Sequence, residues 1–538
     1  MSELYLRTED IQSEKLAALF VSTNEDRQTI EMLKSPTPVI LEGSRGTGKS
    51  FLMRVAEQEL SSRFEDDKVL PVYVSFIKSS LIHSLDPDQF RNWILARLCS
   101  RIIRAFKLKG LLQPSSAAMR LIGGGNISAG IDDFPAIELV SQQYEASWRN
   151  PGSNIDASKV PGIEDFKDAI EDICNANGVK RICVMFDEAA HILLPEQQRQ
   201  FFTLFRDLRS PHIACNAAVY PGVTAYGSSF QPAHDASLRQ VNRDILAPDY
   251  LSNMLEIVMK QAGDGLKRSI ENNRDNFNAL AFAVMGNPRF LLKTISKCPT
   301  LRSTAVSEEI KRFFISEIWS EHSGLAERYA GHRKLIDWGR DFIEKSVIPE
   351  TRKKNDQRSA DGKSESTCYF WLHRDAPQAV KEALRVLSYS GIVQKRDDAI
   401  RGTRSGVGTR YSVILGAVTA HDANPIPATL QIARGLSVKR FTEYGANHGS
   451  FQGMDGISFH SEPNMREVIA AQLARSVDCL EISKKQKDRL KQSGIQTVGD
   501  LLNTSEKELA KKIISVGPVR ARQITNAATA AMLEYLSG

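Results

Sequence analysis

Short apolar runs and amphipathic stretches alternate along the first 300 residues of the chain. The apolar runs at 38–41, 69–76, 182–186 and 213–219 predict buried strands. Residues 25–33, 50–64, 90–106 and 195–208 instead predict helices, most clearly 90–106, where apolar residues repeat at helical spacing. Strands that alternate with helices are typical of a parallel sheet covered by helices, so we expect an α/β fold here.

The first apolar run leads into Gly-Ser-Arg-Gly-Thr-Gly-Lys-Ser at residues 43–50 and then into a predicted helix. This G-x-x-x-x-G-K-S pattern predicts a P-loop, in which glycines let successive backbone N–H groups face phosphate oxygens at a helix N-terminus. Lys49 is expected to reach the β- and γ-phosphates, and the Ser50 hydroxyl to bind Mg²⁺. The predicted nucleotide-binding residues of the loop are Gly43, Ser44, Arg45, Gly46, Thr47, Gly48, Lys49 and Ser50.

Two carboxylates, Asp187 and Glu188, follow the apolar run 182–186. Because α/β sheets bind ligands at the carboxyl ends of their strands, we expect Asp187 to hold Mg²⁺ and Glu188 to polarise the attacking water. On the next strand, Thr224 and Asn216 are both candidates for contact with the γ-phosphate or the water. Thr224 is preferred because Asn216 lies early in the strand, although an ordinary turn residue explains Thr224 equally well.

Residues 251–300 are predicted to form a small helical lid after a nucleotide-binding core at 1–250. In this lid Arg289 follows a proline at a helix start, where it is placed to reach back to the γ-phosphate. Residues 110–162 are rich in Gly, Ser, Pro and Asn, which predicts an insertion or long loop inside the core. Long insertions of this kind often carry partner contacts.

The ordered set GSRGTGKS, VMFDE, AVYPGVTAYG, an arginine before the last strand, and GNPRFLL resembles AAA+ ATPases of the origin-recognition (initiator) type. The resemblance covers roughly residues 37–300. It implies catalytic roles for Lys49, Glu188 and Arg289, the last as the lid (sensor 2) arginine. It also implies an arginine finger given in trans, with Arg239 first and Arg243 second, against a solvated surface arginine as the alternative. The long insertion and the Tyr-Pro-Gly strand ending depart from the family pattern and imply slow or absent turnover.

The chain beyond residue 300 is predicted to hold a helical bridge at 301–350 and a mobile linker at 351–367, which lacks large aliphatic residues. Residues 368–420 then give a helix, a strand, a basic glycine-rich tip and a returning strand, which resembles the end of a winged-helix domain. In that fold the tip contacts DNA, so Arg401, Arg404 and Arg410 are expected to bind phosphates. The alternative is a solvated hairpin in a protein-contacting winged helix.

The last segment, 480–538, resembles helix-hairpin-helix domains and the C-terminal domain of the bacterial RNA polymerase α subunit. Gly517 is expected to form the turn that presents backbone N–H groups to a DNA phosphate, with Lys512, Arg520 and Arg522 beside it. A protein-docking version of the same fold is the alternative.

Positive charge is concentrated in the C-terminal half. Residues 351–420 hold 13 Lys and Arg against 7 Asp and Glu, and residues 480–538 hold 10 against 6, whereas the whole chain has a net charge of +6. A basic half behind a near-neutral ATPase half is typical of an NTPase with its own nucleic-acid contacts. The seven cysteines show no C-x-x-C spacing, which argues against a disulfide framework or a zinc site.

These observations predict a multidomain α/β plus α protein: an AAA+ parallel sheet with a lid, then a winged helix and a helix-hairpin-helix module. We expect an ATPase that uses ATP and Mg²⁺, binds double-stranded DNA and forms homo-oligomers, with nucleotide state controlling assembly or DNA engagement. The lack of an 18-residue apolar run or a signal-peptide pattern predicts a soluble cytoplasmic protein with no membrane partner. The alternatives are a signalling or scaffolding ATPase of a bacterial anti-phage (antiviral defence) assembly that docks proteins, through its C-terminal modules or its insertion, and a transposition or replication-loading regulator.

Overall fold

The computed structural model divides the chain into two compact units. One unit comprises Met1–Glu59, Ala218–Thr224 and Ala236–His460, and the other comprises Leu60–Ala217, Ala225–Asp235 and Ser461–Gly538. The structure describes residues 4–76, 82, 88–111, 116–121, 136–149, 154–189, 195–221, 224, 226, 229–328, 332–403, 406–452, 454, 470, 473–480, 482–513, 516–518, 520–521, 523–525 and 527–528.

A five-stranded sheet carries the predicted α/β fold. Its strands are β1 (Val39–Glu42), β2 (Val69–Ser75), β3 (Arg181–Asp187), β4 (Ile213–Val219) and β5 (Ser237–Gln240), in the order β2-β3-β4-β1-β5. The pairs β2–β3, β3–β4 and β1–β5 are parallel, and Ser75 lies opposite Asp187. Every residue of β4 is buried, as continuous apolar runs predict for central parallel strands. The expected P-loop AAA+ type of sheet is therefore confirmed.

The first unit begins with η1 (Thr8–Asp10), α1 (Ser13–Leu19) and α2 (Asn24–Lys34), and the helix that follows β1 is α3 (Lys49–Ser62). The carboxylate of Glu59 on α3 accepts hydrogen bonds from Arg27 (2.7 and 2.6 Å) and Lys34 (2.8 Å) on α2. The bonds from Arg27, followed by those from Lys34, outweigh burial and lower the pKa of Glu59 to about 2. These charges fix the two helices to each other.

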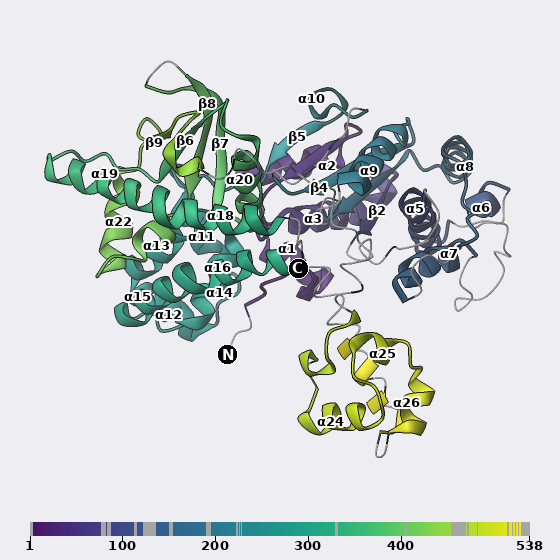
Figure 1. The fold of residues 1–538 in the computed structure, drawn as a ribbon. Helices are drawn as coiled ribbons and strands as arrows, with labels where there is room; N and C mark the ends of the chain where they lie inside the picture. Colours follow the sequence, from purple (N-terminus) through teal and green to yellow (C-terminus); the bar gives the residue numbers. More distant parts are fainter. Residues whose placement is uncertain are drawn as a thin grey trace. The chain divides into compact units, whose positions relative to one another are not determined.

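The rest of the first unit is a helical lid followed by further helices (Figure 1). The lid helices are α11 (Tyr250–Met259), α12 (Asp264–Asn272), α13 (Arg274–Ala283) and α14 (Pro288–Lys297). The next segments are α15 (Ser303–Arg312), the π-helix η4 (Phe313–Glu317), α16 (Ile318–Ser323), α17 (Leu325–Arg328), α18 (Arg333–Phe342), the π-helix η6 (Ile343–Val347) and α19 (Ile348–Ala360). One continuous apolar core joins the lid, these helices and the second sheet.

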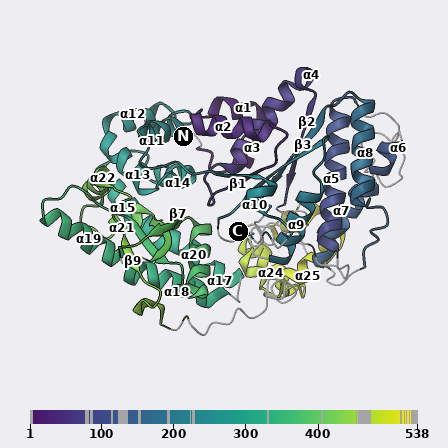
Figure 2. The same cartoon turned by 90° about the horizontal axis from the view of Figure 1, so that it is seen from above.

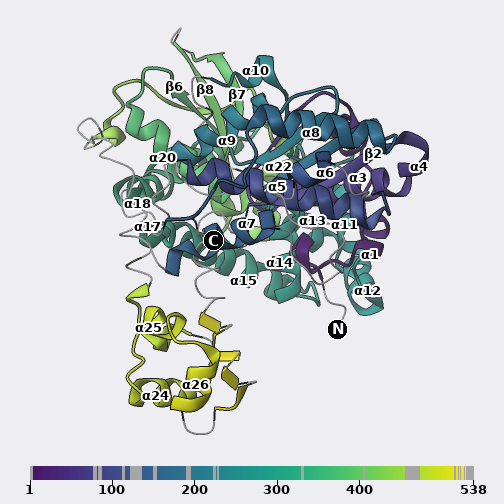
Figure 3. The same cartoon turned by 90° about the vertical axis from the view of Figure 1, so that its right-hand side faces the viewer.

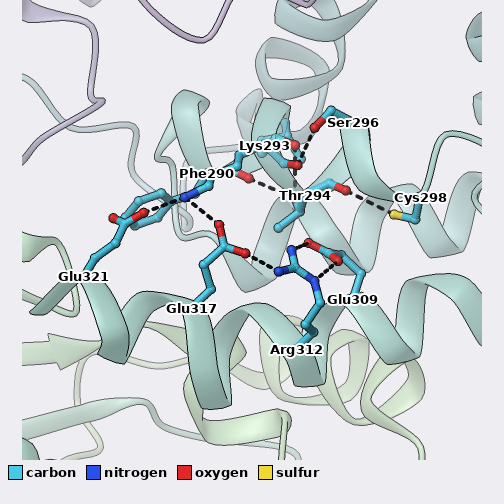
Figure 4. Close-up of polar contacts among 10 residues, drawn as sticks. Phe290, Lys293, Thr294, Ser296, Cys298, Glu309, Arg312, Glu317 and Glu321 are labelled. Atoms are coloured by element: carbon cyan, nitrogen blue, oxygen red, sulfur yellow. Dashed lines mark hydrogen bonds and ion pairs between the residues drawn. The ribbon is translucent and has the colours of Figure 1, made fainter. Parts of the chain in front are cut away.

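An ion-pair network joins the lid helix α14 to the helices that follow it (Figure 4). The ammonium of Lys293 lies 2.6 Å from Glu317 and 2.5 Å from Glu321. Arg312 bridges Glu317 and Glu309 in turn. Burial opposes the charge on Lys293, but its bonds to the two glutamates outweigh burial and raise its pKa. The end of η4 and the helix α16 are thereby tied to the lid.

The second sheet has the strand order β7-β8-β6-β9, formed by β6 (Tyr369–His373), β7 (Val393–Arg401), β8 (Val407–Val413) and β9 (Thr442–Tyr444). The hairpin β7–β8 and the pair β6–β8 are antiparallel, and β9 pairs with β6 in parallel. The helices of this region are α20 (Gln378–Ser390), α21 (Leu415–Thr419) and α22 (Pro425–Gly435), and the short η7 (Gly449–Phe451) follows β9. Below, the C-terminal sheet domain means residues 368–452.

The prediction of a mobile linker at 351–367 is wrong for its first ten residues, because α19 extends to Ala360. Tertiary contacts stabilise this part of the helix, whose sequence is too polar to predict a buried face. Thr351 is fully buried, Arg352 forms an ion pair with Asp422 at 2.7 Å, and Arg358 pairs with Glu365 at 2.5 Å. Ion pairs to residues outside the helix, one of them 70 positions away, therefore hold a helix that has little apolar surface of its own.

The second unit contains β2, β3 and most of β4. Its helices up to residue 235 are α4 (Phe64–Asp67), α5 (Gln89–Leu108), α6 (Ser116–Leu121), α7 (Ala136–Ala146), η3 (Ser147–Arg149), α8 (Ile163–Ala176), α9 (Pro195–Asp207) and α10 (Pro232–Asp235). In this group of helices (Figure 2), α5 packs against α7 and α6 packs against α8. Among the described residues, the predicted long loop at 110–162 contains the helices α6 and α7 and the short η3. Phe76, Phe186 and Phe201 form an aromatic core with ring centroids 5.2–5.5 Å apart.

The C-terminal part of the second unit has its own small core. Figure 3 shows its helices α24 (Lys484–Gln492), α25 (Val498–Leu502) and α26 (Glu506–Lys512) gathered into one group, preceded in the chain by η8 (Val477–Cys479). Ser483, Thr497 and Ser505 each form a capping box at the start of a helix. Reciprocal caps of this kind allow such short helices to form.

Candidate nucleotide-binding site

The loop between β1 and α3 has the backbone that phosphate binding requires. Gly46 and Gly48 have φ angles of 82° and 104°, which side chains rarely allow. The Thr47 hydroxyl donates to the Ser44 carbonyl at 3.0 Å and holds the loop in its curve. The Ser44 hydroxyl is buried without a hydrogen-bond partner among the described residues, as expected where a polar ligand belongs.

Lys49 begins α3 and turns its ammonium back over the loop. Its Nζ donates to the carbonyl oxygens of Gly43 (2.6 Å) and Ser44 (3.0 Å), and it lies 4.2 Å from the centroid of the Tyr220 ring. The residue is only 6% exposed. A buried ammonium on the rim of a glycine loop is suited to a phosphate, which is a stronger acceptor than a carbonyl or an aromatic face.

The lid contacts the loop through the start of α14. Asn287 is the N-cap of this helix, with Oδ1 accepting from Phe290 N at 3.2 Å, while its Nδ2 donates to the Arg45 carbonyl at 2.8 Å. The backbone N–H of Arg289 donates to the Gly46 carbonyl at 3.4 Å. Burial, followed by the positive charge of Arg45, lowers the pKa of Arg289. The structure thus brings Arg289 and the loop together, and it adds Asn287, which the sequence analysis missed although Asn before Pro is a helix-start signal.

The two candidate arginine fingers occupy different places. Arg239 lies within β5, the last strand, rather than before it, and its Nε contacts the Met32 sulfur at 3.0 Å. Arg243 donates to the Thr47 carbonyl at 3.2 Å and pairs with Asp26 at 3.2 Å, so it supports the loop of its own chain. A role in a neighbouring subunit stays a prediction for both.

Asp187 and Glu188 lie in the second unit, at the carboxyl end of β3. Asp187 is 3% exposed, and its carboxylate accepts hydrogen bonds from the Tyr73 hydroxyl and from the Glu188 N–H (3.0 Å). Glu188 has a φ angle of 59°, a costly conformation for this residue type that clusters at functional sites. Tyr73 was not predicted, because the pairing of β2 with β3 that brings it to Asp187 is visible only in the structure.

The two candidates on and after β4 are both buried but have different partners. Asn216 is fully buried within the strand and donates to the Cys183 sulfur at 3.4 Å. Thr224 is buried, and its hydroxyl donates to the Tyr220 carbonyl at 2.7 Å. Thr224 therefore stabilises the turn that carries Tyr220, and its contact with a phosphate stays a prediction.

The predicted DNA-contacting arginines of the β7–β8 hairpin are not alike. Arg401 is exposed at the end of β7, whereas Arg404 lies outside the described residues. The guanidinium of Arg410 is 11% exposed, pairs with Asp397 and donates to the Val438 carbonyl at 2.5 Å. Arg410 thus has a structural role within the sheet domain, and sequence spacing alone did not separate it from Arg401.

In the C-terminal module Lys512, Gly517 and Arg520 are exposed, and Arg522 lies outside the described residues. The turn at Gly517 was expected to present backbone N–H groups at a helix start. The Gly517 carbonyl accepts a hydrogen bond from the Ala521 N–H at 2.9 Å, as at the beginning of a helical turn.

Two family models match parts of the chain. Residues 5–85, which include the whole P-loop, match the model described as ORC-CDC6-like. The N-terminal segment is therefore similar to the ORC-CDC6-like family. The resemblance to the origin-recognition type of AAA+ ATPase is thereby confirmed for this segment. Residues 464–513 match the C-terminal domain of the bacterial RNA polymerase α chain, which agrees with the resemblance inferred for the last module.

Solved structures similar to the chain include a Walker-type ATPase of Pyrococcus abyssi. It is 15% identical, with 80% of this chain and 98% of that chain covered and a TM-score of 0.38. The Aeropyrum pernix Orc1 protein, solved in complex with DNA, is 14% identical, with 78% and 95% covered and a TM-score of 0.33. No curated protein matches the chain.

The described residues contain no group of three or more His, Cys, Asp and Glu side chains arranged for a metal ion. None of the described helices is long and apolar enough to span a membrane. The cysteines are free thiols, as their spacing predicts, and all are buried except Cys479.

Proposed function

We propose that this chain is an ATPase that binds ATP with Mg²⁺ at the ORC-CDC6-like P-loop and whose nucleotide state controls oligomer assembly and the engagement of double-stranded DNA. The observation that carries the proposal is the loop itself. Its two left-handed glycines, the Lys49 ammonium on its rim and the lid helix with Arg289 together form a cradle for a polyphosphate.

The donor sets also fit Mg²⁺, which prefers oxygen ligands. The Ser50 hydroxyl follows Lys49 at the start of α3, and Asp187 ends β3 with its carboxylate held by Tyr73. Mg²⁺ bound there would neutralise charge on the phosphates. Glu188 would orient the attacking water as the base, and Arg289 would stabilise charge on the γ-phosphate.

Binding and hydrolysis of ATP test the enzymatic part of the proposal. Lys49→Ala is expected to abolish ATP binding, measured by calorimetry, and Asp187→Ala to abolish Mg²⁺-dependent phosphate release. Lys180→Ala, which changes an exposed lysine outside the site, is the matched control. Hydrolysis that persists in Asp187→Ala at the wild-type rate would refute the assigned role.

DNA binding rests on the basic C-terminal half, with Arg401, Lys512, Gly517 and Arg520 as the described contact candidates. Such contacts release counterions, so duplex affinity is expected to fall about 10³-fold or more between about 50 and 200 mM salt if six or more phosphates are contacted. Arg401→Glu should weaken binding and flatten this slope, whereas Lys297→Glu on the lid, also an exposed site, should do so much less. A full-length chain that shows no duplex affinity at low salt would refute this part.

Assembly is tested by the molar mass of the full chain with and without ATP and DNA. We expect a larger species with ATP, and Arg239→Ala to lower hydrolysis without lowering ATP affinity if it acts in a neighbouring subunit. A mass that does not respond to ATP would remove the oligomer from the proposal.

A further inference from the structure

Tyr220 and Tyr389 connect the P-loop to the C-terminal sheet domain within the first unit. The Tyr220 ring, just beyond β4, covers the Lys49 ammonium at 4.2 Å. The edge of one tyrosine ring meets the face of the other, with centroids 5.0 Å apart and an interplanar angle of 68°. Both rings are buried in a small apolar cluster with Leu325, Ala326, Ile336 and Val386, separate from the main core.

The turn after α20 lies against the loop as well. The guanidinium carbon of Arg45 lies 5.9 Å from the centroid of the Tyr389 ring. Gly391 has a φ of 79°, and a Cβ built on it would stand 3.5 Å from the Ser44 hydroxyl. Ser44 and Arg45, which follow the first glycine of the loop, therefore contact the C-terminal sheet domain as well as the core that carries the loop.

Residues of β7 beside this turn also contact the segments around the nucleotide-binding loop and the lid. Arg396 on β7 forms an ion pair with Asp244 at 2.7 Å, and Gln394 donates to the Met285 carbonyl at 3.3 Å. Lys395 and Asp398 on β7 also act electrostatically on Glu42, the last residue of β1, where burial raises the pKa of the carboxyl. The start of β7 is thus joined to the nucleotide-binding elements by exchangeable polar contacts, in addition to the main core that holds Ile392 and Val393.

We propose that Tyr220 is a positioning residue for Lys49 and that the Tyr220–Tyr389 pair couples occupancy of the P-loop to docking of the C-terminal sheet domain. The inference rests on the proposed function, because the ligand that moves Lys49 is the triphosphate of ATP. A phosphate competes with the two loop carbonyls and the Tyr220 ring for the same ammonium. When Lys49 turns to the phosphate, the Tyr220 ring loses the cation that it covers, and Arg45 is drawn from Tyr389 toward the same negative charge.

Coupling of this kind is reciprocal. If ATP loosens the turn at 389–391, then a change that loosens the turn must strengthen ATP binding, at most by the factor by which ATP prefers the loosened state. Simple packing makes the opposite prediction: loss of a buried ring would lower stability and leave ATP affinity unchanged or reduced. The direction in which ATP affinity changes therefore distinguishes coupling from simple packing.

Hydrogen exchange of the full-length wild-type chain is the first test and needs no variant. Exchange in a peptide that covers residues 386–395 is expected to rise with Mg²⁺-ATP, while exchange around Phe451, on the same domain but away from the loop, stays constant. Unchanged exchange at 386–395 under conditions in which calorimetry shows bound ATP would overturn the coupling and leave the proposed function intact. Failure of the wild-type chain to bind ATP would overturn both.

ATP affinity of variants is the second test. Tyr389→Ala should raise affinity about fivefold, a typical coupling of just under 1 kcal/mol, whereas Tyr389→Phe should keep the wild-type value because the ring contacts remain. Phe451→Ala removes a buried ring of the same domain and is the control for destabilisation alone. Equal affinity in Tyr389→Ala and Phe451→Ala would overturn the inference.

Discussion

Asn287 offers the sharpest test of how the lid shapes the P-loop. It is 1% exposed and makes two hydrogen bonds, one as acceptor and one as donor. Its Oδ1 accepts from the Phe290 N–H and caps α14, and its Nδ2 donates to the Arg45 carbonyl. Loss of the N-cap costs about 1 kcal/mol. Loss of the amide–carbonyl bond costs about 1 kcal/mol more, because the carbonyl loses its donor in a partly buried place.

Asn287→Ala should therefore destabilise the loop–lid junction by about 2 kcal/mol, which corresponds to as much as about 30-fold in ATP affinity if the loop must be ordered before it binds. Asn287→Ser keeps an N-cap oxygen without adding charge and is too short to reach the Arg45 carbonyl, so it isolates the cost of the lost amide–carbonyl bond. Affinity is measured by calorimetry and stability by urea unfolding.

A matched control exists in the same lid. Asn276 donates to the Leu301 carbonyl at 2.7 Å, away from the P-loop, so Asn276→Ala removes a similar bond without touching the loop. It should lower stability and leave ATP affinity unchanged. The reasoning is refuted if Asn287→Ala loses stability but binds ATP as tightly as the wild type.

Three further predictions concern the site and the fold. Gly46→Ala should weaken ATP binding about tenfold or more, because φ is 82° and the added Cβ would stand 2.6 Å from that of Arg289; an unchanged calorimetric affinity contradicts this. Tyr73→Phe should slow phosphate release about tenfold with little change in ATP affinity, since it removes one bond that orients Asp187; equal rates would show that the bond is dispensable. Burial lowers the pKa of His322 from 6.5 to about 4, so between these pH values the imidazole is protonated in the unfolded chain and neutral in the folded one. The contribution of His322 to the free energy of unfolding is therefore fully present above pH 6.5 and falls by about 3 kcal/mol as the pH drops to 4. Urea unfolding across pH 4–7 measures the slope, and His322→Gln should reduce it; an identical slope in the variant assigns it to other groups.

The sequence predicted four of the five strands of the main sheet closely, because each of these is a continuous apolar run. Strand β5 was not predicted, because Leu238 is its one apolar residue. The predicted strand 213–219 coincides with β4, and the P-loop glycines have the positive φ that the pattern requires. Helix α19 was missed because ion pairs to Asp422 and Glu365, distant in sequence or outside the helix, stabilise a polar segment that local patterns assign to a linker.

Within the site, the sequence identified the groups that carry charge and missed those that orient them. Lys49, Asp187 and Arg289 belong to motifs, whereas Tyr73 and Asn287 act through hydrogen bonds to residues 114 and 242 positions away. Long-range pairing of this kind leaves no periodic signal. The same limit explains Arg410, whose partner Asp397 lies across a hairpin and removes it from the exposed set.

The π-helical turns at Phe313–Glu317 and Ile343–Val347 have a consequence for variation in chain length. A π turn holds one residue more than an α turn, so deletion of one residue inside it can restore an ordinary helix while the flanking turns keep their facing. Trp319 and His322 would then remain pointed inward after the loss of Ile315. Elsewhere in the same helices, a one-residue deletion would rotate every later side chain by about 100° and expose the buried ones. These two turns are therefore the places where the helical region can shorten without being repacked.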